Sequence, residues 1–306
     1  MSEHGEPRLR SARDATGRLI DTGGIGLTPE PFTRPLTCPD PRCSVGIAPV
    51  REHHRTTENG GTSTVIAHFR LNPGTRHRPT CRYDPDGVIA AIAADSEGTA
   101  TAAAGRLRLL VPADFTGTSQ TTTADSGGSR HTALKVGSGS PSLPPVIGSA
   151  AAIQRFLDRY PGDPEAAAMF HITYAGRDIA WADFCFGDDP IALLHLTRRI
   201  AKDQAPDHPI AIHGTITGTG AARTGNSFYA EQDLRTRIVL TGRSRLLHVR
   251  LRSRDERLTQ PLTVGRRFLA LGTWSTFAPA NGHSAELVLW LRKPWQVHVW
   301  DVSDGE

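Results

Sequence analysis

The alternation of apolar and polar positions divides the chain into two structured halves. In the first half, short apolar runs bounded by turn residues predict strands at Val45–Val50, Thr64–Leu71 and Arg106–Val111. An Asn-Gly-Gly sequence at 59–61 predicts a turn between the first two strands. The alanine-rich run Gly87–Ala104 favours a short helix.

Two helices are predicted at the start of the second half. Ser149 is a candidate N-cap, and apolar residues then recur at helical spacing up to Tyr160, before a Pro-Gly stop. The pair Asp189-Pro190 predicts the start of a second helix that runs to Ile200. Between the two helices, a hairpin is predicted from strands at Phe170–Tyr174 and Ile179–Phe186.

The last third of the chain is rich in strands that are punctuated by glycine. The predicted strands are Pro209–Thr217, Thr236–Thr241, Leu246–Arg254, Arg266–Phe277, Ala285–Arg292 and Gln296–Val302. Several strands of this length in about a hundred residues favour a small barrel or sandwich. The expected fold class is therefore α+β and mostly β.

Composition changes along the chain predict its domain boundaries. Residues 1–30 are polar and aperiodic, which predicts disorder, and residues 31–112 hold the clustered cysteines and the first strands. Residues 113–146 are rich in Gly, Ser, Thr and Pro and are expected to form a flexible linker. Residues 147–205 are expected to pack as a helix-hairpin-helix segment on a barrel formed by residues 206–306.

Charge and hydropathy narrow the range of functions. The 306-residue chain is 38% hydrophobic, and no apolar run approaches the roughly 20 residues of a membrane span. With a polar N-terminus, this predicts a cytoplasmic protein without a membrane partner. A net charge of +4, carried mostly by arginine, favours a polyanionic partner. The alternative is a GC-rich genome, which raises arginine content without any role in binding.

Three of the four cysteines lie in one stretch together with a histidine, in a pattern typical of structural zinc sites. Cys38 and Cys43 flank a turn with two prolines, and His77 and Cys81 are separated by three residues. Four protein ligands leave no open position, so the predicted zinc is structural rather than catalytic. His68 is the alternative fourth ligand. His53 and His54 also lie near, and unconnected free thiols are the competing interpretation.

This stretch also resembles the zinc-finger-like N-terminal module of competence protein CoiA-like and related bacterial mobile-element proteins. The matching residues are Cys38, Cys43, the sequence at 68–70 (HFR), His77 and Cys81. The resemblance covers about a quarter of the chain. No Asp followed by a Glu-x-Lys cluster comes after the module, so the nuclease activity of CoiA proteins is not carried over.

The C-terminal third is similar to an oligonucleotide-binding (OB) fold. HPIAIHGTITGTG, from residue 208, is similar to the first strand of such barrels, with a glycine where the strand bends. LTVGRRFLALGTW, from residue 262, is similar to the third strand of such barrels, in which a Leu-x-x-Gly turn leads into an apolar strand and then a glycine. The resemblance implies a barrel that binds single-stranded nucleic acid.

One strand carries the basic surface that this function requires. Leu247, Val249 and Leu251 alternate with basic residues, so one face suits a core and the other a polyanion. Residues 230–267 hold ten arginines against four acidic residues, a local excess of six, whereas the whole chain has only +4. The predicted nucleic-acid-binding residues are Arg243, Arg245, His248, Arg250, Arg252, Arg254, Arg267 and, as the best candidate for base stacking, Trp274.

Motifs of common enzymes are missing from the chain. There is no P-loop, GxSxG or HExxH sequence, and no dinucleotide fingerprint follows a strand. Cys185 lies between two phenylalanines, which predicts a buried structural thiol. Asp183, Asp188 and Asp189 are better explained as a helix cap and turn than as a metal site.

These observations predict a non-catalytic nucleic-acid-binding protein with a structural Zn²⁺ ion. Single-stranded DNA is favoured over RNA, in bacterial DNA processing or mobile-element biology. The zinc module is a further candidate surface for nucleic acid or for a protein partner. A protein-interaction scaffold in a bacterial assembly is the first alternative, because arginines can also meet acidic protein surfaces. A CoiA-like nuclease whose motif is not recognisable is the second.

Overall fold

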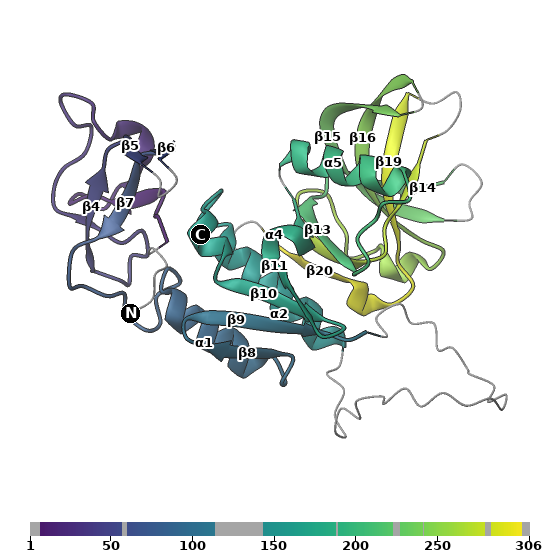
Figure 1. Ribbon diagram of the computed structural model, residues 1–306, viewed down its shortest axis with the longest axis horizontal. Helices are drawn as coiled ribbons and strands as arrows, with labels where there is room; N and C mark the ends of the chain where they lie inside the picture. Colours follow the sequence, from purple (N-terminus) through teal and green to yellow (C-terminus); the bar gives the residue numbers. More distant parts are fainter. Residues whose placement is uncertain are drawn as a thin grey trace. The chain divides into compact units, whose positions relative to one another are not determined.

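The fold is α+β and mostly β, as predicted (Figure 1). The computed structural model describes residues 7–56, 60–113, 143–187, 189–222, 227–240, 242–278 and 283–301. None of the helices in these parts of the chain has the length and apolar character that a membrane span requires.

The chain divides into two compact units, and each unit combines segments that are distant in sequence. Unit 1 comprises residues 1–95, 101–108 and 152–171, and unit 2 comprises residues 96–100, 109–151 and 172–306. This grouping differs from the contiguous domains expected from composition. Part of the segment after the predicted linker belongs with the cysteine-containing residues.

The five-stranded sheet of unit 1 includes residues expected to be disordered. Its strand order is β2–β1–β3–β4–β7, and its pairings are antiparallel. Disorder up to residue 30 was a wrong expectation for residues 7–30, because β1 pairs with both β2 and β3 and buries Ala12 completely. The strands are β1 (Ser11–Arg13), β2 (Leu19–Asp21), β3 (Leu36–Thr37), β4 (Gly46–Val50) and β7 (His68–Leu71).

The predicted strand Thr64–Leu71 is two strands in two sheets. β7 joins the five-stranded sheet, whereas β6 (Thr62–Val65) pairs with β5 (His53–Thr56) as a separate antiparallel ribbon. All the residues of β5 are exposed. This strand was not predicted because its residues are all polar and give no apolar alternation.

A four-stranded sheet has the order β11–β10–β9–β8. The predicted helix Gly87–Ala104 is correct only in its first part: α1 (Pro85–Asp95) ends before Glu97 and Gly98, which both have positive φ. The predicted hairpin is confirmed and turns at Ala175-Gly176, where both residues have the positive φ of a tight turn. Its second strand ends at Ala180 rather than Phe186, because residues 181–184 are helical. The strands are β8 (Ala100–Ala103), β9 (Arg106–Val111), β10 (Phe170–Tyr174) and β11 (Arg177–Ala180).

Helix α2 (Leu143–Leu157) begins earlier than predicted. Residues 114–142, most of the expected linker, lie outside the described residues, but residues 143–146 are already helical. Ser149 lies inside the helix and is not its N-cap. Pro144 and Pro145 occupy the first turn, where a missing N–H is tolerated, which explains why a helix starts there. The predicted apolar stripe is confirmed, with Phe156 and Tyr160 buried.

The described residues of unit 2 from Trp181 onward form two further sheets and two helices. One sheet has the order β12–β13–β17–β20 and the other β14–β15–β16–β19–β18. The strands are β12 (Cys185–Phe186), β13 (Ile210–Thr215), β14 (Gly218–Ala221), β15 (Phe228–Leu240), β16 (Arg243–Ser253), β17 (Arg267–Gly272), β18 (Ser275–Phe277), β19 (Ser284–Trp290) and β20 (Val297–Trp300). The remaining elements are α3 (Pro164–Ala167) of unit 1, α4 (Trp181–Phe184), α5 (Pro190–Ala201) and the 3₁₀ turns η1 (Thr22–Gly24), η2 (Glu256–Leu258) and η3 (Pro294–Gln296).

The predicted barrel is not closed, because its strands fall into two sheets. The chain leaves one sheet and enters the other between β13 and β14, and again between β17 and β18. Glycine is required near both bends: a Cβ on Gly214 would lie 1.9 Å from the Gln232 side chain, and one on Gly272 would lie 2.5 Å from Leu289. The chain thus bends near a glycine, as predicted, although Gly214 and Gly272 themselves are still paired in the β13–β17 ladder.

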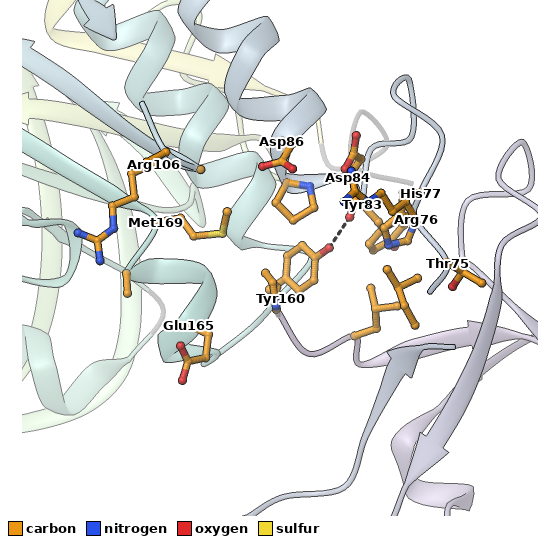
Figure 2. Close-up of a pocket in the computed structure, with 17 residues that line it drawn as sticks. Thr75, Arg76, His77, Tyr83, Asp84, Asp86, Arg106, Tyr160, Glu165 and Met169 are labelled. Carbon is orange, nitrogen blue, oxygen red and sulfur yellow. Dashed lines mark hydrogen bonds between the residues drawn. The ribbon is translucent and has the colours of Figure 1, made fainter. Parts of the chain in front are cut away.

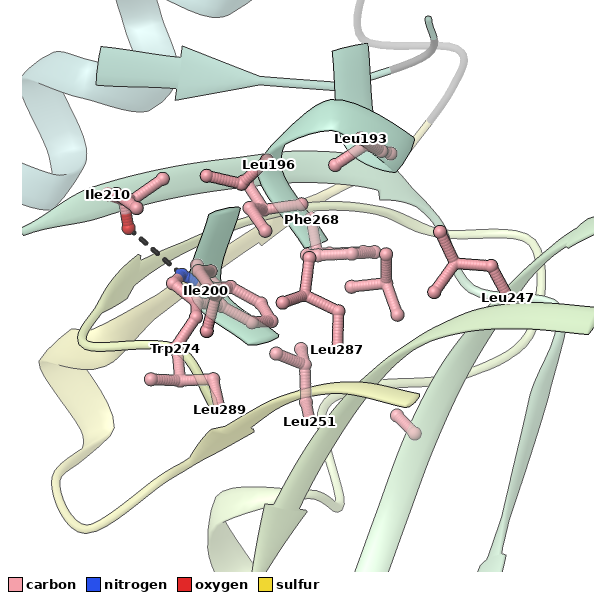
Figure 3. Close-up of a cluster of buried hydrophobic side chains, with 14 of the residues drawn as sticks. Leu193, Leu196, Ile200, Ile210, Leu247, Leu251, Phe268, Trp274, Leu287 and Leu289 are labelled. Atoms are coloured by element: carbon pink, nitrogen blue, oxygen red, sulfur yellow. Dashed lines mark hydrogen bonds between the residues drawn. The ribbon is translucent and has the colours of Figure 1, made fainter. Parts of the chain in front are cut away.

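A single apolar cluster joins α5 to both sheets of unit 2 (Figure 3). Leu193 and Leu196 of α5 contribute to it, and the side chain of Asp189 caps this helix by accepting from the Ile191 N–H at 2.8 Å, as predicted. Trp274 also lies in the cluster, and its Nε1 donates to the Ile210 carbonyl at 3.0 Å. The apolar surface buried here is the main source of stability of unit 2.

Candidate functional site

The first two sulfur ligands lie on a tight loop between β3 and β4. The N–H of Cys38 donates to the Val45 carbonyl at 3.0 Å, and the N–H of Cys43 donates to the Asp40 carbonyl at 2.9 Å. The Asp40 carboxylate accepts from the Arg42 N–H at 2.9 Å, as in an Asx turn. These bonds fix the backbone of the loop, so both sulfurs are held on one side of it.

The second pair of ligands precedes α1. The N–H of Cys81 donates to the Arg78 carbonyl at 2.8 Å, which closes a turn with His77 at its start. Asp84 caps α1 by accepting from the Gly87 N–H at 3.1 Å. A Cβ on Gly87 would lie 2.3 Å from the Pro79 carbonyl oxygen, so only glycine lets the helix approach this turn so closely.

The four predicted ligands converge on one point. The sulfurs of Cys38 and Cys81 are 3.6 Å apart, and Nδ1 of His77 lies 3.6 Å from the Cys43 sulfur and 3.5 Å from the Cys81 sulfur. All four ligand atoms lie within 4.8 Å of one another. A disulfide, which needs a sulfur separation of about 2.05 Å, is excluded. The cluster therefore has the composition and spacing to hold a metal ion.

Hydrogen bonds within the cluster favour a thiolate. The hydrogen bond from Cys38 is the main reason why the pKa of Cys81 is lowered to about 4. Burial raises this pKa, and the hydrogen bond with His77 lowers it. The pKa of Cys38 is raised, first by the same hydrogen bond and then by burial. The N–H of Tyr83 also points at the Cys81 sulfur, at 3.4 Å. Because metal ligands must be deprotonated, a thiolate at Cys81 prepares the site for a cation.

The alternative ligand His68 lies away from this cluster. Its side chain is 7% exposed, and its Nδ1 lies 2.9 Å from the Ile66 carbonyl oxygen. Burial lowers the pKa of His68, so it favours the neutral form. His53 and His54 lie on the exposed strand β5 and are not part of the cluster either. His77 is therefore the fourth member.

Residues that follow α2 support the segment after Cys81. The hydroxyl of Tyr160 donates to the Tyr83 carbonyl at 2.7 Å (Figure 2). Arg159 donates to the Arg82 carbonyl at 3.2 Å. A cavity of about 440 Å³ adjoins His77 and is lined by both tyrosines. The supporting role of residues 159–160 could not be seen in the sequence, because 77 positions separate them from their partners.

The basic strand has the predicted alternation but lacks the predicted free charge. Leu247, Val249 and Leu251 are buried as expected. On the other face, Arg250 forms ion pairs with Glu231 and Glu286, and Arg252 forms one with Glu286. The register explains these pairs, since Glu231 of β15 is directly opposite Arg250, and β19 brings Glu286 opposite His248. The expected continuous basic face is therefore largely neutralised.

The other predicted nucleic-acid-binding residues have mixed settings. Arg245 is only 1% exposed, and Trp274 is a core residue, so the exposed position expected for both is wrong. Trp274 was misjudged because the bend after Gly272 turns it inward. Arg267 is half-buried and lies 3.2 Å from Nδ1 of His213, while Arg243 and Arg254 are exposed.

Among the described residues, the tryptophan with an exposed ring is Trp290 and not the predicted Trp274. Trp290, which was not among the predicted binding residues, is 40% exposed, and Phe277 is 50% exposed. The alternation in β19 contains the missed signal, since Leu289 and Leu291 are buried and the residue between them points outward. Cys185 is buried, as predicted, and Asp188 lies outside the described residues.

No protein-family model matches this chain, and no curated protein was found to match it in sequence.

Proposed function

We propose that Cys38, Cys43, His77 and Cys81 bind one Zn²⁺ ion. Ligands at about 2.3 Å (sulfur) and about 2.0 Å (nitrogen) from a tetrahedral zinc are separated by roughly 3.5 to 3.8 Å. The separations of 3.5 and 3.6 Å in the cluster agree with this geometry, and this agreement is the observation that carries the proposal. Thiolates with an imidazole favour zinc over magnesium or calcium, which bind oxygen ligands.

Zinc bound in this way has a structural role. Four protein ligands fill a tetrahedral site and leave no position for a catalytic water. The ion joins the loop between β3 and β4 to the turn that leads into α1, across 43 positions of sequence. Because the strands nearby are short, metal binding supplies folding free energy that a small core does not.

The metal is tested by elemental analysis of the purified full chain. We expect about one zinc per chain, and replacement of zinc by cobalt should give the thiolate charge-transfer band and the strong visible bands of a tetrahedral site. A C43S variant should lose this spectrum, whereas C185S should keep it. A protein that contains no metal and binds no cobalt with its thiols reduced would refute the zinc site.

We infer further that the chain is a non-catalytic nucleic-acid-binding protein that favours single-stranded DNA over RNA. Two features of unit 2 support this function. Segments 210–221 and 267–277 each bend and contribute to both sheets, as expected of the partly open barrel of an OB fold. Tyr229, Phe277 and Trp290 lie on the outer face of the larger sheet, where aromatic rings can stack on bases. The CoiA-like zinc module suggests a role in bacterial DNA processing or mobile elements.

A protein-interaction scaffold is the second candidate. The ion pairs of Arg250 and Arg252 favour it, because they leave an outer face with little net charge beside Trp290 and Phe277. Tryptophan, tyrosine and arginine are the residues that most often dominate protein interfaces. A neutral aromatic surface is therefore compatible with a protein partner as well as with bases.

Fluorescence anisotropy separates the two candidates. The full chain is titrated into labelled single- and double-stranded oligonucleotides of DNA and RNA at two salt concentrations. Preferential, salt-dependent binding of single-stranded DNA supports the nucleic-acid function. Absence of binding to every oligonucleotide at low salt refutes it and favours the scaffold. Cleavage of DNA that depends on an added divalent metal would instead support the nuclease alternative.

A further inference from the structure

We propose that unit 2 binds a short stretch of single-stranded nucleic acid in a basic groove between residues 253–262 and 290–299. This inference rests on the proposed function for the class of its ligand, and it adds the place of contact. The groove follows the ends of β16 and β19. Of the residues that the sequence analysis singled out, only Arg254 belongs to it.

Two adjoining cavities form this groove. One has a volume of about 700 Å³ and the other about 510 Å³, and Asp255, Leu258 and Arg292 line both. The shared lining makes the two cavities continuous. Two joined cavities can take successive nucleotides of one extended strand.

The groove has the positive charge that the face of β16 lacks. Four basic residues line it, against the single carboxylate of Asp255, which leaves an excess of three positive charges. Asp255 forms an ion pair with Arg257. Within the described parts of the chain, the other three cations have no ion-pair partner, so they remain able to bind phosphates. These three are Arg254, Arg292 and Lys293.

Apolar and aromatic groups complete the surface. Leu258, Leu262 and Val299 line the larger cavity, and Trp290 lines the smaller one. Trp290 is 40% exposed and neighbours Arg252 in the sheet. The exposed indole lines the smaller cavity together with Arg254 and Arg292, which have no ion-pair partner among the described residues. A nucleotide offers a flat base to the indole and an anionic phosphate to the arginines. A ligand without aromatic rings would not use the indole.

Hydrogen bonds hold the two sides of the groove in place. The N–H of Leu291 donates to the Arg252 carbonyl at 2.7 Å, and the hydroxyl of Ser253 donates to the Leu291 carbonyl at 3.1 Å. The side chain of Gln296 accepts from the N–H of Arg292 at 2.6 Å and from that of Lys293 at 3.0 Å. The basic residues therefore project from a preformed backbone, which lowers the entropic cost of binding.

The test compares two triple variants that remove equal charge from unit 2. R254A/R292A/K293A removes the free cations of the groove, and R198A/R199A/K202A removes exposed cations at the end of α5. Both are titrated into labelled oligo(dT) and compared with the wild-type chain. We expect the groove variant to bind at least about tenfold more weakly, with a salt slope reduced by about 2, and the control to bind nearly as the wild type does.

The outcomes distinguish this inference from the proposed function. If the wild-type chain binds oligo(dT) and the groove variant binds as tightly as the control, the groove is overturned and the proposed function stands. If the wild-type chain binds no oligonucleotide, both fail together. If a nucleoside monophosphate displaces oligo(dT) at equal nucleotide concentration, the occupant is a free nucleotide and the strand proposal is overturned.

Trp290 provides an independent readout. We expect W290A to weaken binding about tenfold at both low and high salt, because stacking does not depend on counterion release. W290F keeps an aromatic ring and should recover most of the affinity. Equal losses in W290A and W290F, or no loss in either, would show that the indole does not stack on a base.

Discussion

Unit 1 and unit 2 are stabilised in different ways. In unit 2, long strands such as β15 with 13 residues and β16 with 11 residues cover one continuous apolar cluster. In unit 1, β1 has three residues and β3 has two, and the loops between strands meet at the cluster of cysteines and His77. Short strands bury little apolar surface, so a bound metal can supply what the core does not.

The two units therefore depend on different features of the sequence for their folding. A metal site depends on a few residues at the right spacing, and the chain around them can be polar. An apolar core depends on many residues, each of which contributes a part of the free energy of unfolding. If this contrast holds, a single ligand controls the folding of unit 1, whereas no single polar residue controls that of unit 2.

The largest expected effect is the loss of unit 1 in a C81S variant. All five tryptophans, at positions 181, 274, 290, 295 and 300, belong to unit 2, so their fluorescence reports that unit alone. A structural zinc ion contributes about 10 kcal/mol or more, so loss of the proposed ion should unfold unit 1. We expect C81S to lose zinc and amide protection in residues 31–95, while the thermal transition of the tryptophan fluorescence stays unchanged.

The control for this experiment is H68A, which removes the alternative ligand. It should retain zinc, because the His68 ring lies against the Ile66 carbonyl rather than the sulfurs. Loss of zinc in H68A would contradict the ligand set. A shift of the tryptophan transition in C81S would show instead that the two units fold as one.

The second largest effect is expected in F268A, within the core of unit 2. Phe268 is 1% exposed, and truncation of such a phenylalanine costs about 3 to 5 kcal/mol through lost burial and a residual cavity. The tryptophan transition should move to lower denaturant concentration, with zinc content unchanged. V264A is the matched control, since Val264 is 62% exposed and its truncation should cost less than about 0.5 kcal/mol. Similar midpoints for the two variants would contradict this core.

A smaller effect is expected when Glu286 is removed from the ion-pair network of unit 2. Glu286 is 4% exposed and accepts hydrogen bonds from Arg250 and Arg252, whose side chains are mostly buried. E286A leaves these guanidinium groups short of a partner and should cost about 2 to 3 kcal/mol in urea unfolding. E256A, at an exposed glutamate, serves as the control. Stability equal to that of E256A would mean that the network contributes nothing.

The metal cluster could be predicted because its chemistry is local. Cys38 with Cys43, and His77 with Cys81, each lie on one turn, and the residue types alone indicate a group that could hold a metal ion. The choice between His68 and His77 was left open, since it depends on which way β7 turns its side chains relative to a loop more than 20 residues earlier. Sequence spacing does not contain that information.

The basic strand shows the opposite case. The inward face of β16 was predicted correctly because burial follows from alternation along one strand. The outward face was predicted wrongly because its charges are neutralised by other strands, and Glu286 arrives from a parallel neighbour 36 positions away. In the same way, the burial of Trp274 results from a bend that brings it under Ile210, 64 positions earlier.

The smallest expected effect is that of removing a helix cap. It allows the two units to be compared directly, because an aspartate caps a helix in each of them. Asp189 is exposed and caps α5, so D189A should cost about 1 kcal/mol in the tryptophan transition. Asp84 caps α1 beside the metal cluster, and burial raises the pKa of its carboxyl. A raised pKa in the folded state means that folding disfavours the charged form at neutral pH.

An aspartate cap contributes a hydrogen-bond acceptor and a negative charge. Substitution by asparagine separates the two contributions, because it keeps the acceptor oxygen and removes the charge. At pH 7 we expect D189N to match the wild type, whereas D84N should retain zinc against a chelator slightly longer than the wild type does. The measurements are urea unfolding for α5 and the rate of zinc release for α1. Faster zinc release from D84N than from the wild type would mean that the charge of Asp84 stabilises unit 1, whereas the difference between D84N and D84A measures the contribution of the acceptor oxygen.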